Sequence, residues 1–161
     1  MKIRKATIND LEELTKIEAE CFPATEAAKE ESFRGRLEVY PDFFWILENE
    51  DGKIVSFVNG MATDDEILVD EMFENPNLHD GNGDWQMIFG VNTLPEFRRR
   101  GYAEKVLRKV VEDAKNAGRK GVVLTCKDRL VSFYGKIGFV NEGLSESTHG
   151  GAVWYNMRIV F

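Results

Sequence analysis

Residues 85–126 read as strand, loop, helix and strand, and this order constrains the fold more than any other feature of the chain. Residues 85–93 alternate large apolar side chains with other residues, which predicts a strand. Residues 104–117 repeat apolar side chains at helical spacing, and Gly118 follows as a frequent helix terminator. Residues 121–126 form a short apolar run that is typical of a buried strand. Because a helix connects the two strands, we expect them to run parallel.

The basic segment 98–103 joins the first of these strands to the helix and has the features of a pyrophosphate-binding loop. Arg98, Arg99 and Arg100 supply positive charge and several hydrogen-bond donors. Gly101 permits close approach of the backbone, and the helix start offers unpaired N–H groups and a partial positive charge. A solvated basic loop and a nucleic-acid patch are the alternatives. The glycine, the small Ala103 and the strand-to-helix position favour phosphate binding.

The remaining segments predict a single domain, residues 1–161, with a mixed α/β fold. Further strands are expected at residues 2–6, 43–48, 53–62, 138–142 and 152–160, and further helices at residues 11–21, 26–40, 67–73 and 128–136. The segment 49–52 predicts a hairpin turn between two of the strands. Thr7 followed by Asp10 resembles a capping box at the start of the first helix.

Charge and composition exclude several classes of protein. The net charge of −7 argues against nucleic acid as a partner. The apolar runs are shorter than the ~20 residues that span a bilayer, and no signal-peptide core follows Met1. Cys21 and Cys126 suit a reducing cytosol, and His79 and His149 make no metal-ligand spacing with them. We therefore expect a cytoplasmic monomer or homodimer that binds no nucleic acid, membrane or metal.

Acidic residues are concentrated in the middle of the chain. No Lys or Arg occurs in residues 54–97, and most of the Asp and Glu of this stretch lie in the irregular segment 64–84. One interpretation is a solvated acidic loop. The other is an entrance that attracts a cationic substrate such as an amine, and the sequence leaves both open.

Two motifs at a fixed separation resemble a known family. They are Pro95-x-x-Arg98-x-x-Gly101-x-Ala103 after a strand, and Phe133-Tyr134-x-x-x-Gly138-Phe139 after the next strand. This combination resembles the GNAT N-acetyltransferases, and the similarity extends to the element order of nearly the whole chain. Within that family, residues 124–134 and 21–23 most resemble the arylalkylamine (serotonin-type) N-acetyltransferases. The resemblance implies a mixed, largely antiparallel sheet of about six or seven strands, flanked by helices, with two splayed parallel central strands.

The resemblance also implies acetyl-CoA as cosubstrate. The main chain of the splayed strand would pair with the pantetheine amides, and the loop and helix start would hold the pyrophosphate. The implied cofactor-binding residues are Val91, Asn92, Thr93, Arg98, Arg99, Arg100, Gly101, Tyr102, Ala103 and Glu104. Lys127 departs from the asparagine that many family members place against the cofactor.

Proton removal from the acceptor is the chemical step that most needs a side chain. A primary amine has a pKa of about 10.4, so losing its proton at pH 7 costs roughly 4.6 kcal/mol. The serotonin-type enzymes use two histidines, and the matching positions here are Met87 and Phe89. Glu26, after the bend at residues 21–23, is our candidate base, with Asp84 as a second choice. As an alternative, Glu26 is an acid stabilised by the dipole of the second helix.

The other expected roles follow from the departure of the coenzyme A thiolate. Tyr134 would protonate the sulfur as general acid, although a purely structural role as a core aromatic is the alternative. A main-chain N–H on the splayed strand would stabilise the oxygen of the tetrahedral intermediate. Aromatic side chains that could line the amine pocket are Phe22, Phe33, Phe43, Phe44, Trp45 and Trp154.

These expectations combine into an acetyl-CoA-dependent N-acetyltransferase. Its acceptor would be a small primary amine of arylalkylamine or polyamine-like type, acetylated by direct transfer without a covalent enzyme intermediate. The alternatives are a transferase that acts on a protein N-terminus or lysine, and a catalytically silent regulatory module that binds coenzyme A.

Overall fold

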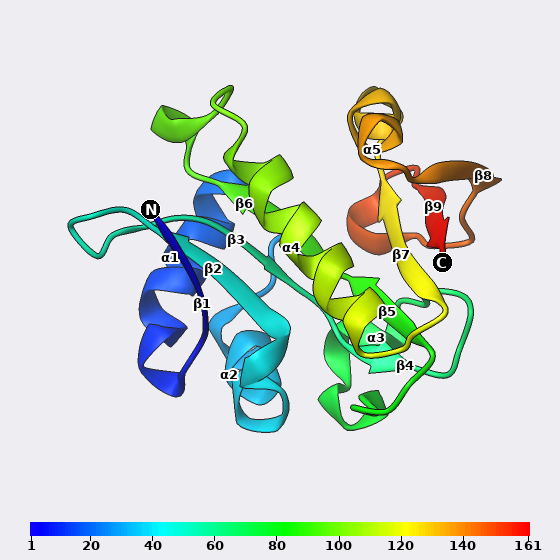
Figure 1. The fold of residues 1–161 in the computed structure, drawn as a ribbon, viewed down its shortest axis with the longest axis horizontal. Coiled ribbons are helices and arrows are strands. Elements are labelled where there is room, and N and C mark those ends of the chain that lie inside the picture. The colour runs from blue at the N-terminus through cyan, green and yellow to red at the C-terminus, as the bar shows by residue number, and fades with distance from the viewer.

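The computed structural model describes residues 1–161 as two sheets and five α-helices (Figure 1). The strands are β1 (Lys2–Lys5), β2 (Phe44–Glu48), β3 (Ile54–Asn59), β4 (Ala62–Thr63), β5 (Trp85–Ile88), β6 (Gly90–Thr93), β7 (Gly121–Cys126), β8 (Val140–Leu144) and β9 (Tyr155–Val160). The α-helices are α1 (Leu11–Cys21), α2 (Glu30–Val39), α3 (Glu71–Glu74), α4 (Tyr102–Asn116) and α5 (Val131–Ile137). One sheet has the strand order β1-β2-β3-β6 and the other β4-β5-β7-β9-β8. The predicted mixed α/β fold is confirmed.

Helix α4 packs across both sheets, and the first sheet separates two regions of the core. In Figure 1 the helix runs diagonally over the strands, and it contacts β2, β3, β6 and β7. Its predicted inner face is buried at Val106, Leu107, Val110 and Ala114. A second apolar cluster lies among α1, α2 and the first sheet. None of the helices combines the length and the apolar character needed to cross a membrane.

The predicted strand at residues 85–93 is divided at Phe89, which corrects the sequence prediction. Residues before Phe89 form β5, which pairs in parallel with β7 from Trp85 opposite Gly121 to Ile88 opposite Leu124. Residues after it form β6, which pairs antiparallel with β3 in the other sheet. The parallel arrangement of the two helix-linked strands is confirmed. The splay at Phe89 leaves one edge of β6 without a neighbouring strand.

A close approach of two chains explains a second division. The expected strand at residues 53–62 separates into β3 and β4 around Gly60. A Cβ at Gly60 would lie 1.9 Å from the carbonyl oxygen of Met87, so only glycine fits there. The chain therefore passes from one sheet to the other at two neighbouring points, between β3 and β4 and between β5 and β6.

The second helix begins four residues later than predicted. Residues 24–26 form a turn, in which the amides of Glu26 and Ala27 both donate to the carbonyl of Pro23 at 2.9 Å. Helix α2 starts only at Glu30. Glu26 is therefore not the N-terminal acid of a helix, and that alternative explanation of the residue is wrong.

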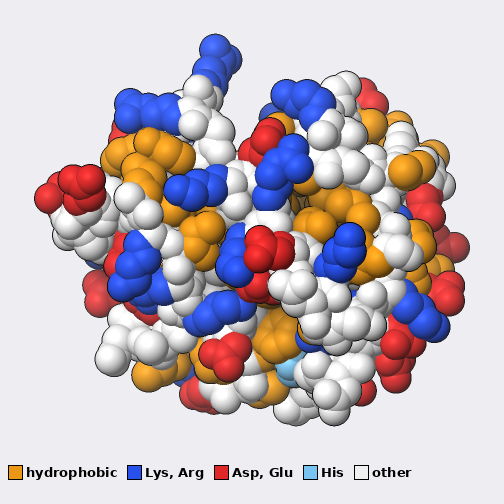
Figure 2. Space-filling model, in the orientation of Figure 1, with side chains coloured by type: hydrophobic (Ala, Val, Ile, Leu, Met, Phe, Trp, Pro, Cys, Tyr) orange, Lys and Arg blue, Asp and Glu red, His pale blue; other side chains and the backbone are white.

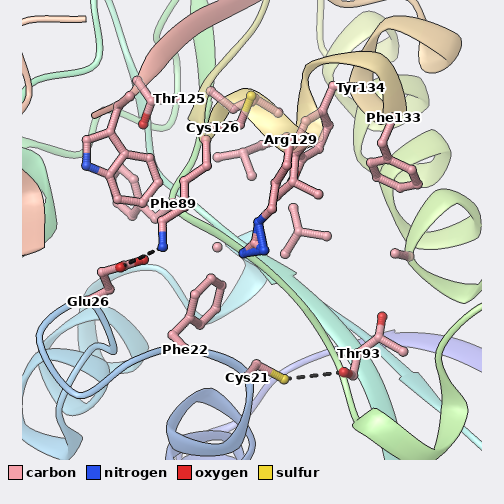
Figure 3. Close-up of a pocket in the computed structure, with 18 of the residues that line it drawn as sticks. Cys21, Phe22, Glu26, Phe89, Thr93, Thr125, Cys126, Arg129, Phe133 and Tyr134 are labelled. Carbon is pink, nitrogen blue, oxygen red and sulfur yellow. Dashed lines mark hydrogen bonds and ion pairs between the residues drawn. The ribbon is translucent and has the colours of Figure 1, made fainter. Parts of the chain in front are cut away.

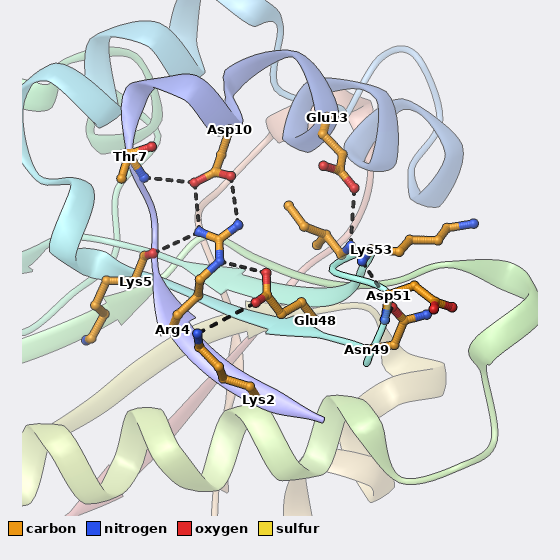
Figure 4. A network of polar contacts seen from close by, with 11 residues as sticks. Lys2, Arg4, Lys5, Thr7, Asp10, Glu13, Glu48, Asn49, Asp51 and Lys53 are labelled. Carbon is orange, nitrogen blue, oxygen red and sulfur yellow. Dashed lines mark hydrogen bonds and ion pairs between the residues drawn. The ribbon is translucent and has the colours of Figure 1, made fainter.

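An ion-pair network joins β1 to β2 and to the start of α1 (Figure 4). The guanidinium of Arg4 donates to both carboxylate oxygens of Asp10 at 2.9 Å and to Glu48 at 2.8 Å. Asp10 also accepts from the Thr7 amide at 2.8 Å. Thr7 and Asp10 form the predicted capping box, but it caps the 3-10 turn Ile8–Asp10 that leads into α1 and not α1 itself. Burial acts to raise the pKa of Asp10, but the bonds from Arg4 and Thr7 outweigh it and hold the pKa below its ordinary value.

Candidate active site

A cavity of about 520 Å³ opens where β6 and β7 diverge. Its walls come from β6, the end of β7, the α1–α2 connection, the start of α4 and α5. Figure 2 shows the surface hollowed between the two halves of the molecule, with Lys and Arg side chains on both rims. Within the cavity, Figure 3 shows Phe22 and Glu26 on one side and Cys126 and Tyr134 on the other.

The free edge of β6 forms one wall. Leu94 donates to the carbonyl of Val55 at 3.0 Å, and the alternation of an antiparallel ladder then turns the main-chain groups of Val91 and Thr93 away from β3. Both residues line the cavity. An extended polar ligand can therefore pair with this edge as an additional strand would.

Asn92, which was predicted to bind the cofactor together with Val91 and Thr93, does not line the cavity. It faces β3, and its carbonyl accepts from the Ser56 hydroxyl at 2.6 Å. The carbonyl of Thr93 accepts instead from the Cys21 thiol at 3.3 Å and from Arg98 Nε at 3.0 Å. These two bonds hold the end of β6 beside α1 and orient Arg98 along the cavity wall.

The loop before α4 has two residues in the left-handed backbone region. Arg99 has φ 64° and Gly101 has φ 80°. A non-glycine residue in this region is uncommon and is often found at ligand-binding loops. The first intrahelical bond runs from the Lys105 amide to Gly101 at 3.0 Å, so the amides at the helix start lack an intrahelical partner. This geometry suits an anion.

The predicted loop residues are divided between the cavity wall and its margin. Arg98, Arg99 and Ala103 line the cavity. The other four predicted residues adjoin these in the chain but do not line the cavity, namely Arg100, Gly101, Tyr102 and Glu104. A Cβ at Gly101 would meet no atom within 4 Å, so the space into which a side chain would project from this position is open.

Tyr134 lies in the cavity wall and also in the core beneath α4. Its ring packs edge-on against Phe133 and Phe139 at centroid distances of 5.1 and 5.9 Å. Burial raises the pKa of the Tyr134 hydroxyl well above its ordinary value. The hydroxyl therefore keeps its proton at neutral pH and is not available as a base.

Glu26 and Lys127 form an ion pair across the cavity. The Lys127 ammonium lies 2.7 Å from Glu26 Oε2. The other carboxylate oxygen of Glu26 is buried and makes no hydrogen bond. Asp84, the second choice for a base, lies outside the cavity at the opposite end of β5, where it pairs with Lys120 at 3.3 Å. The structure thus brings Glu26 into the site and leaves Asp84 out.

Among the cavity residues that the sequence analysis did not predict are Glu18 and His149. Glu18 lies on the buried face of α1, at helical spacing from Leu14 and Cys21, and is 6% exposed. A charged residue at an apolar position of a helix was the available signal. His149 donates or accepts through Nε2 at 2.8 Å from the Glu26 carbonyl, and its ring stacks on Phe73 at 4.7 Å. No local pattern distinguishes it.

The aromatic and sulfur groups are distributed differently from the prediction. Phe22 and Trp154 line the cavity, together with Phe89. The other aromatic candidates lie in or against the apolar core and not in the cavity wall, namely Phe33, Phe43, Phe44 and Trp45. Burial raises the pKa of the Cys126 thiol to about 11, so this cysteine is not an activated nucleophile. No three His, Cys, Asp or Glu side chains are grouped to hold a metal ion.

The acidic segment 64–84 contributes no carboxylate to the cavity wall. Asp70 accepts hydrogen bonds from the Ser147 hydroxyl and the Thr148 amide, and so anchors the loop before His149. Asp64 accepts from the Asp84 amide at 3.1 Å. These contacts favour a structural and solvated role for the segment over a charged entrance.

Comparison with known proteins agrees with this geometry. Residues 11–139 match the model of the acetyltransferase (GNAT) family. Glucosamine 6-phosphate N-acetyltransferase 1 of Oryza sativa subsp. japonica is 40% identical over 47 residues, which span 29% of this chain and only 28% of the relative. The loading GNATL domain of CurA from Lyngbya majuscula has a TM-score of 0.83 at 20% identity, covering 99% of this chain and 96% of that one. The GphF GNAT-like decarboxylase in complex with isobutyryl-CoA has a TM-score of 0.82 at 22% identity, covering 99% of both chains.

Proposed function

Since the chain belongs to the acetyltransferase (GNAT) family, we propose that it transfers the acetyl group of acetyl-CoA directly to the nitrogen of a small primary amine. The observation that carries the proposal is the continuous path from the free edge of β6 to the start of α4. Along it, the main-chain groups of Val91 and the N–H of Thr93 can pair with two amides of pantetheine, since the Thr93 carbonyl already accepts from Cys21 and Arg98. The amides between Arg99 and Glu104 would then hold the pyrophosphate.

Two side chains on opposite walls would carry the proton transfers. Glu26 is the proposed acceptor of the first proton, from the incoming ammonium, and its buried Oε1 has no competing partner. The neutral amine attacks the thioester carbon, and collapse of the tetrahedral intermediate releases the coenzyme A thiolate. Tyr134, which lines the cavity, is the proposed donor to that sulfur.

The surroundings of Glu26 support one class of acceptor. Phe22, Phe89 and Trp154 offer aromatic surface in the cavity that also holds the carboxylates of Glu18 and Glu26. A primary ammonium on an aromatic or apolar body fits this combination better than a multiply charged sugar phosphate, because the body can pack on the rings. We therefore favour an arylalkylamine acceptor, as the motif at residues 124–134 also suggests.

The test is release of free thiol from acetyl-CoA in the presence of arylalkylamines, polyamines, amino acids, glucosamine 6-phosphate and short peptides. We expect the highest kcat/KM with an arylalkylamine. Turnover confined to peptides would move the assignment to a protein acetyltransferase and contradict the small-amine proposal.

A silent coenzyme A-binding module is the second candidate, and one observation favours it. The Lys127 ammonium occupies Glu26 Oε2 at 2.7 Å, where the ammonium of a substrate would be expected to bind. Acetyl-CoA binding measured by calorimetry, without thiol release over the whole amine panel, would support this candidate instead.

A further inference from the structure

The candidate active site contains a primary amine that belongs to the chain itself. Lys127 is the only lysine among the residues that line the cavity. It directly follows β7, the strand that diverges from β6, along which pantetheine is proposed to bind. Its Nζ lies 2.7 Å from Glu26 Oε2, and this bond is the dashed line at Glu26 in Figure 3. An amine of this chain is therefore already hydrogen-bonded to the proposed base.

The loop before β9 holds Glu26 in a fixed position. His149 Nε2 lies 2.8 Å from the Glu26 carbonyl oxygen, and the carbonyl of His149 accepts from Trp154 Nε1 at 2.9 Å. A Cβ at Gly150 would lie 2.5 Å from Glu26 Cγ, so the close packing of this loop requires glycine. The Glu26 side chain is only 6% exposed. The carboxylate is thus fixed, whereas its partner amine is carried on the flexible stem of a lysine.

A purely structural ion pair is the alternative explanation of this contact. A buried ion pair offsets the cost of desolvation only when further hydrogen bonds satisfy the remaining atoms. Here Glu26 Oε1 is buried without a partner. On its other side, the Lys127 ammonium has the ring of Trp154, with the centroid at 5.7 Å. The pair therefore lacks the additional bonds that a stabilising contact needs, and it lies in the cavity where the reaction is proposed.

We propose that Lys127 is an acetylation site, and that acetyl-CoA bound in the same molecule is the acetyl donor. This inference rests on the proposed acetyl transfer, because it uses the same donor and the same base. An external ammonium positioned by Glu26 and the ammonium of Lys127 occupy the same carboxylate oxygen. Since Lys127 is tethered beside the bound thioester, its effective concentration greatly exceeds that of a free amine.

The transfer balances in atoms and protons. The Lys127 ammonium passes one proton to Glu26, and the neutral nitrogen attacks the thioester carbon to form a C–N bond. The nitrogen then releases its second proton to solvent, and the C–S bond breaks. The departing thiolate takes the proton of Tyr134, which solvent restores, and Glu26 returns its proton to solvent. The products are N-acetyllysine and free coenzyme A, with one net proton released.

Acetylation would change the charge at the acceptor position. It converts the ammonium of Lys127 into a neutral amide and so removes the ion-pair partner of Glu26. The carboxylate is then free to bind and deprotonate an external amine. The unmodified chain is accordingly the blocked form of the site, and a single transfer to Lys127 opens it.

The main test is mass spectrometry after incubation with acetyl-CoA in the absence of any amine. The protein is made by cell-free translation without acetyl-CoA, so that Lys127 starts unmodified. We expect one acetyl group per chain at Lys127, formed about 100-fold faster than at Lys16. Lys16 is the matched control, because it also pairs with a glutamate, Glu12 at 3.4 Å, but is 72% exposed and lies outside the cavity. Equal rates at the two lysines would overturn the proposal.

Two further measurements establish where the acetyl group comes from. Excess free coenzyme A should slow acetylation of Lys127 by competing for the bound donor, and should leave the slow reaction of Lys16 unchanged. Diluting the protein tenfold at saturating acetyl-CoA should not change the rate at Lys127. A rate that falls with dilution would mean transfer between two molecules, and a rate that ignores coenzyme A would mean attack on acetyl-CoA in solution. Either result contradicts the proposal.

Variants test the base and the consequence of the modification. Glu26→Gln should slow acetylation of Lys127 about 100-fold, because it keeps a hydrogen-bond acceptor but removes the base. Lys127→Gln resembles the acetylated side chain, whereas Lys127→Arg keeps the charge beside Glu26 and has no amine to acetylate. We expect kcat/KM for the best amine to be about tenfold higher in Lys127→Gln than in Lys127→Arg. Equal values would exclude the blocking role of the ion pair.

The results separate this inference from the proposed function. Turnover of an external amine by a chain whose Lys127 stays unmodified would overturn the acetylation of Lys127 and leave the amine transfer standing. Acetylated Lys127 in a chain that turns over no external amine would support this inference and contradict the small-amine proposal. Absence of both reactions would overturn both.

Discussion

Tyr134 shows how burial limits the chemical roles open to a single side chain. Its ring is part of the core and the residue also lines the cavity, so a structural role and the proposed donor role are compatible. The raised pKa keeps the proton on the oxygen and argues against a role as base, whereas the proposed donor role rests on the place of the residue in the cavity wall.

Tyr134→Phe should therefore lower kcat about 100-fold and change the KM for acetyl-CoA little, because the ring remains and only the proton is lost. Steady-state thiol release with the best amine measures both constants. An unchanged kcat would remove Tyr134 from the mechanism.

Glu26→Gln should lose most activity at pH 7 and regain part of it near pH 9. Below the pKa of the amine, about 10.4, the fraction of free amine rises about tenfold for each unit of increase in pH. The need for a base therefore declines as the pH rises. The pH profile of kcat/KM for the amine checks this, with Glu20→Gln, which alters an exposed carboxylate of α1, as the control. A constant deficit across that range would argue that Glu26 binds the ammonium without accepting its proton.

At the level of elements, the glycines that flank α4 allow the role of the loop before the helix to be tested against that of the loop after it. Gly101 and Gly118 bracket the helix with φ of 80° and 78°, and a Cβ at either position meets no atom within 4 Å. A side chain at either position costs about 1–2 kcal/mol through the left-handed backbone. Only Gly101 adjoins the proposed pyrophosphate site.

Gly101→Glu should abolish acetyl-CoA binding, while Gly118→Glu should bind as the wild type does. The two variants share the same backbone strain and the same added charge, and therefore a similar loss of stability. Isothermal titration calorimetry with acetyl-CoA gives the affinities, and thermal unfolding gives the stabilities. Equal affinities in the two variants would rule out the proposed role of the loop.

At the scale of the whole molecule, the Arg4 network joins the first strand to the first helix and contributes to stability in a pH-dependent way. The pKa of Asp10 in the folded protein lies below its ordinary value, so its contribution is present above pH ~4 and is lost as the pH falls through the folded pKa. The ion pair with Arg4 is only part-buried, which limits its size.

Asp10→Asn should lower the free energy of unfolding by about 1–2 kcal/mol at pH 7, because the amide still accepts from Thr7 but no longer balances Arg4. Urea unfolding at pH 7 and at pH 3 tests this, and the difference from the wild type should shrink at pH 3. Asp51→Asn, in an exposed turn, is the control. A difference that stays constant with pH would exclude the ion pair as its source.

The sequence by itself determined the features that depend on neighbours within a few residues. The inner face of α4, the positive φ at Gly118 and the capping box of Thr7 and Asp10 follow from side chains one helical turn apart or from glycine itself. The family motifs also marked the cavity wall at Arg98 and Tyr134. These are local properties, and the rest of the fold leaves them unchanged.

Only the tertiary structure decided how distant groups meet. Glu26 and Lys127 are separated by 101 positions, and their contact depends on how β7 lies against the α1–α2 connection. The division of one apolar run at Phe89 depends on which strands each half can pair with, and alternation of side chains carries no such information. The side chains of Glu18, Asn59 and Asn92 likewise meet beside Gly90 only because α1, β3 and β6 converge there, and burial and pairing are properties of the assembled chain.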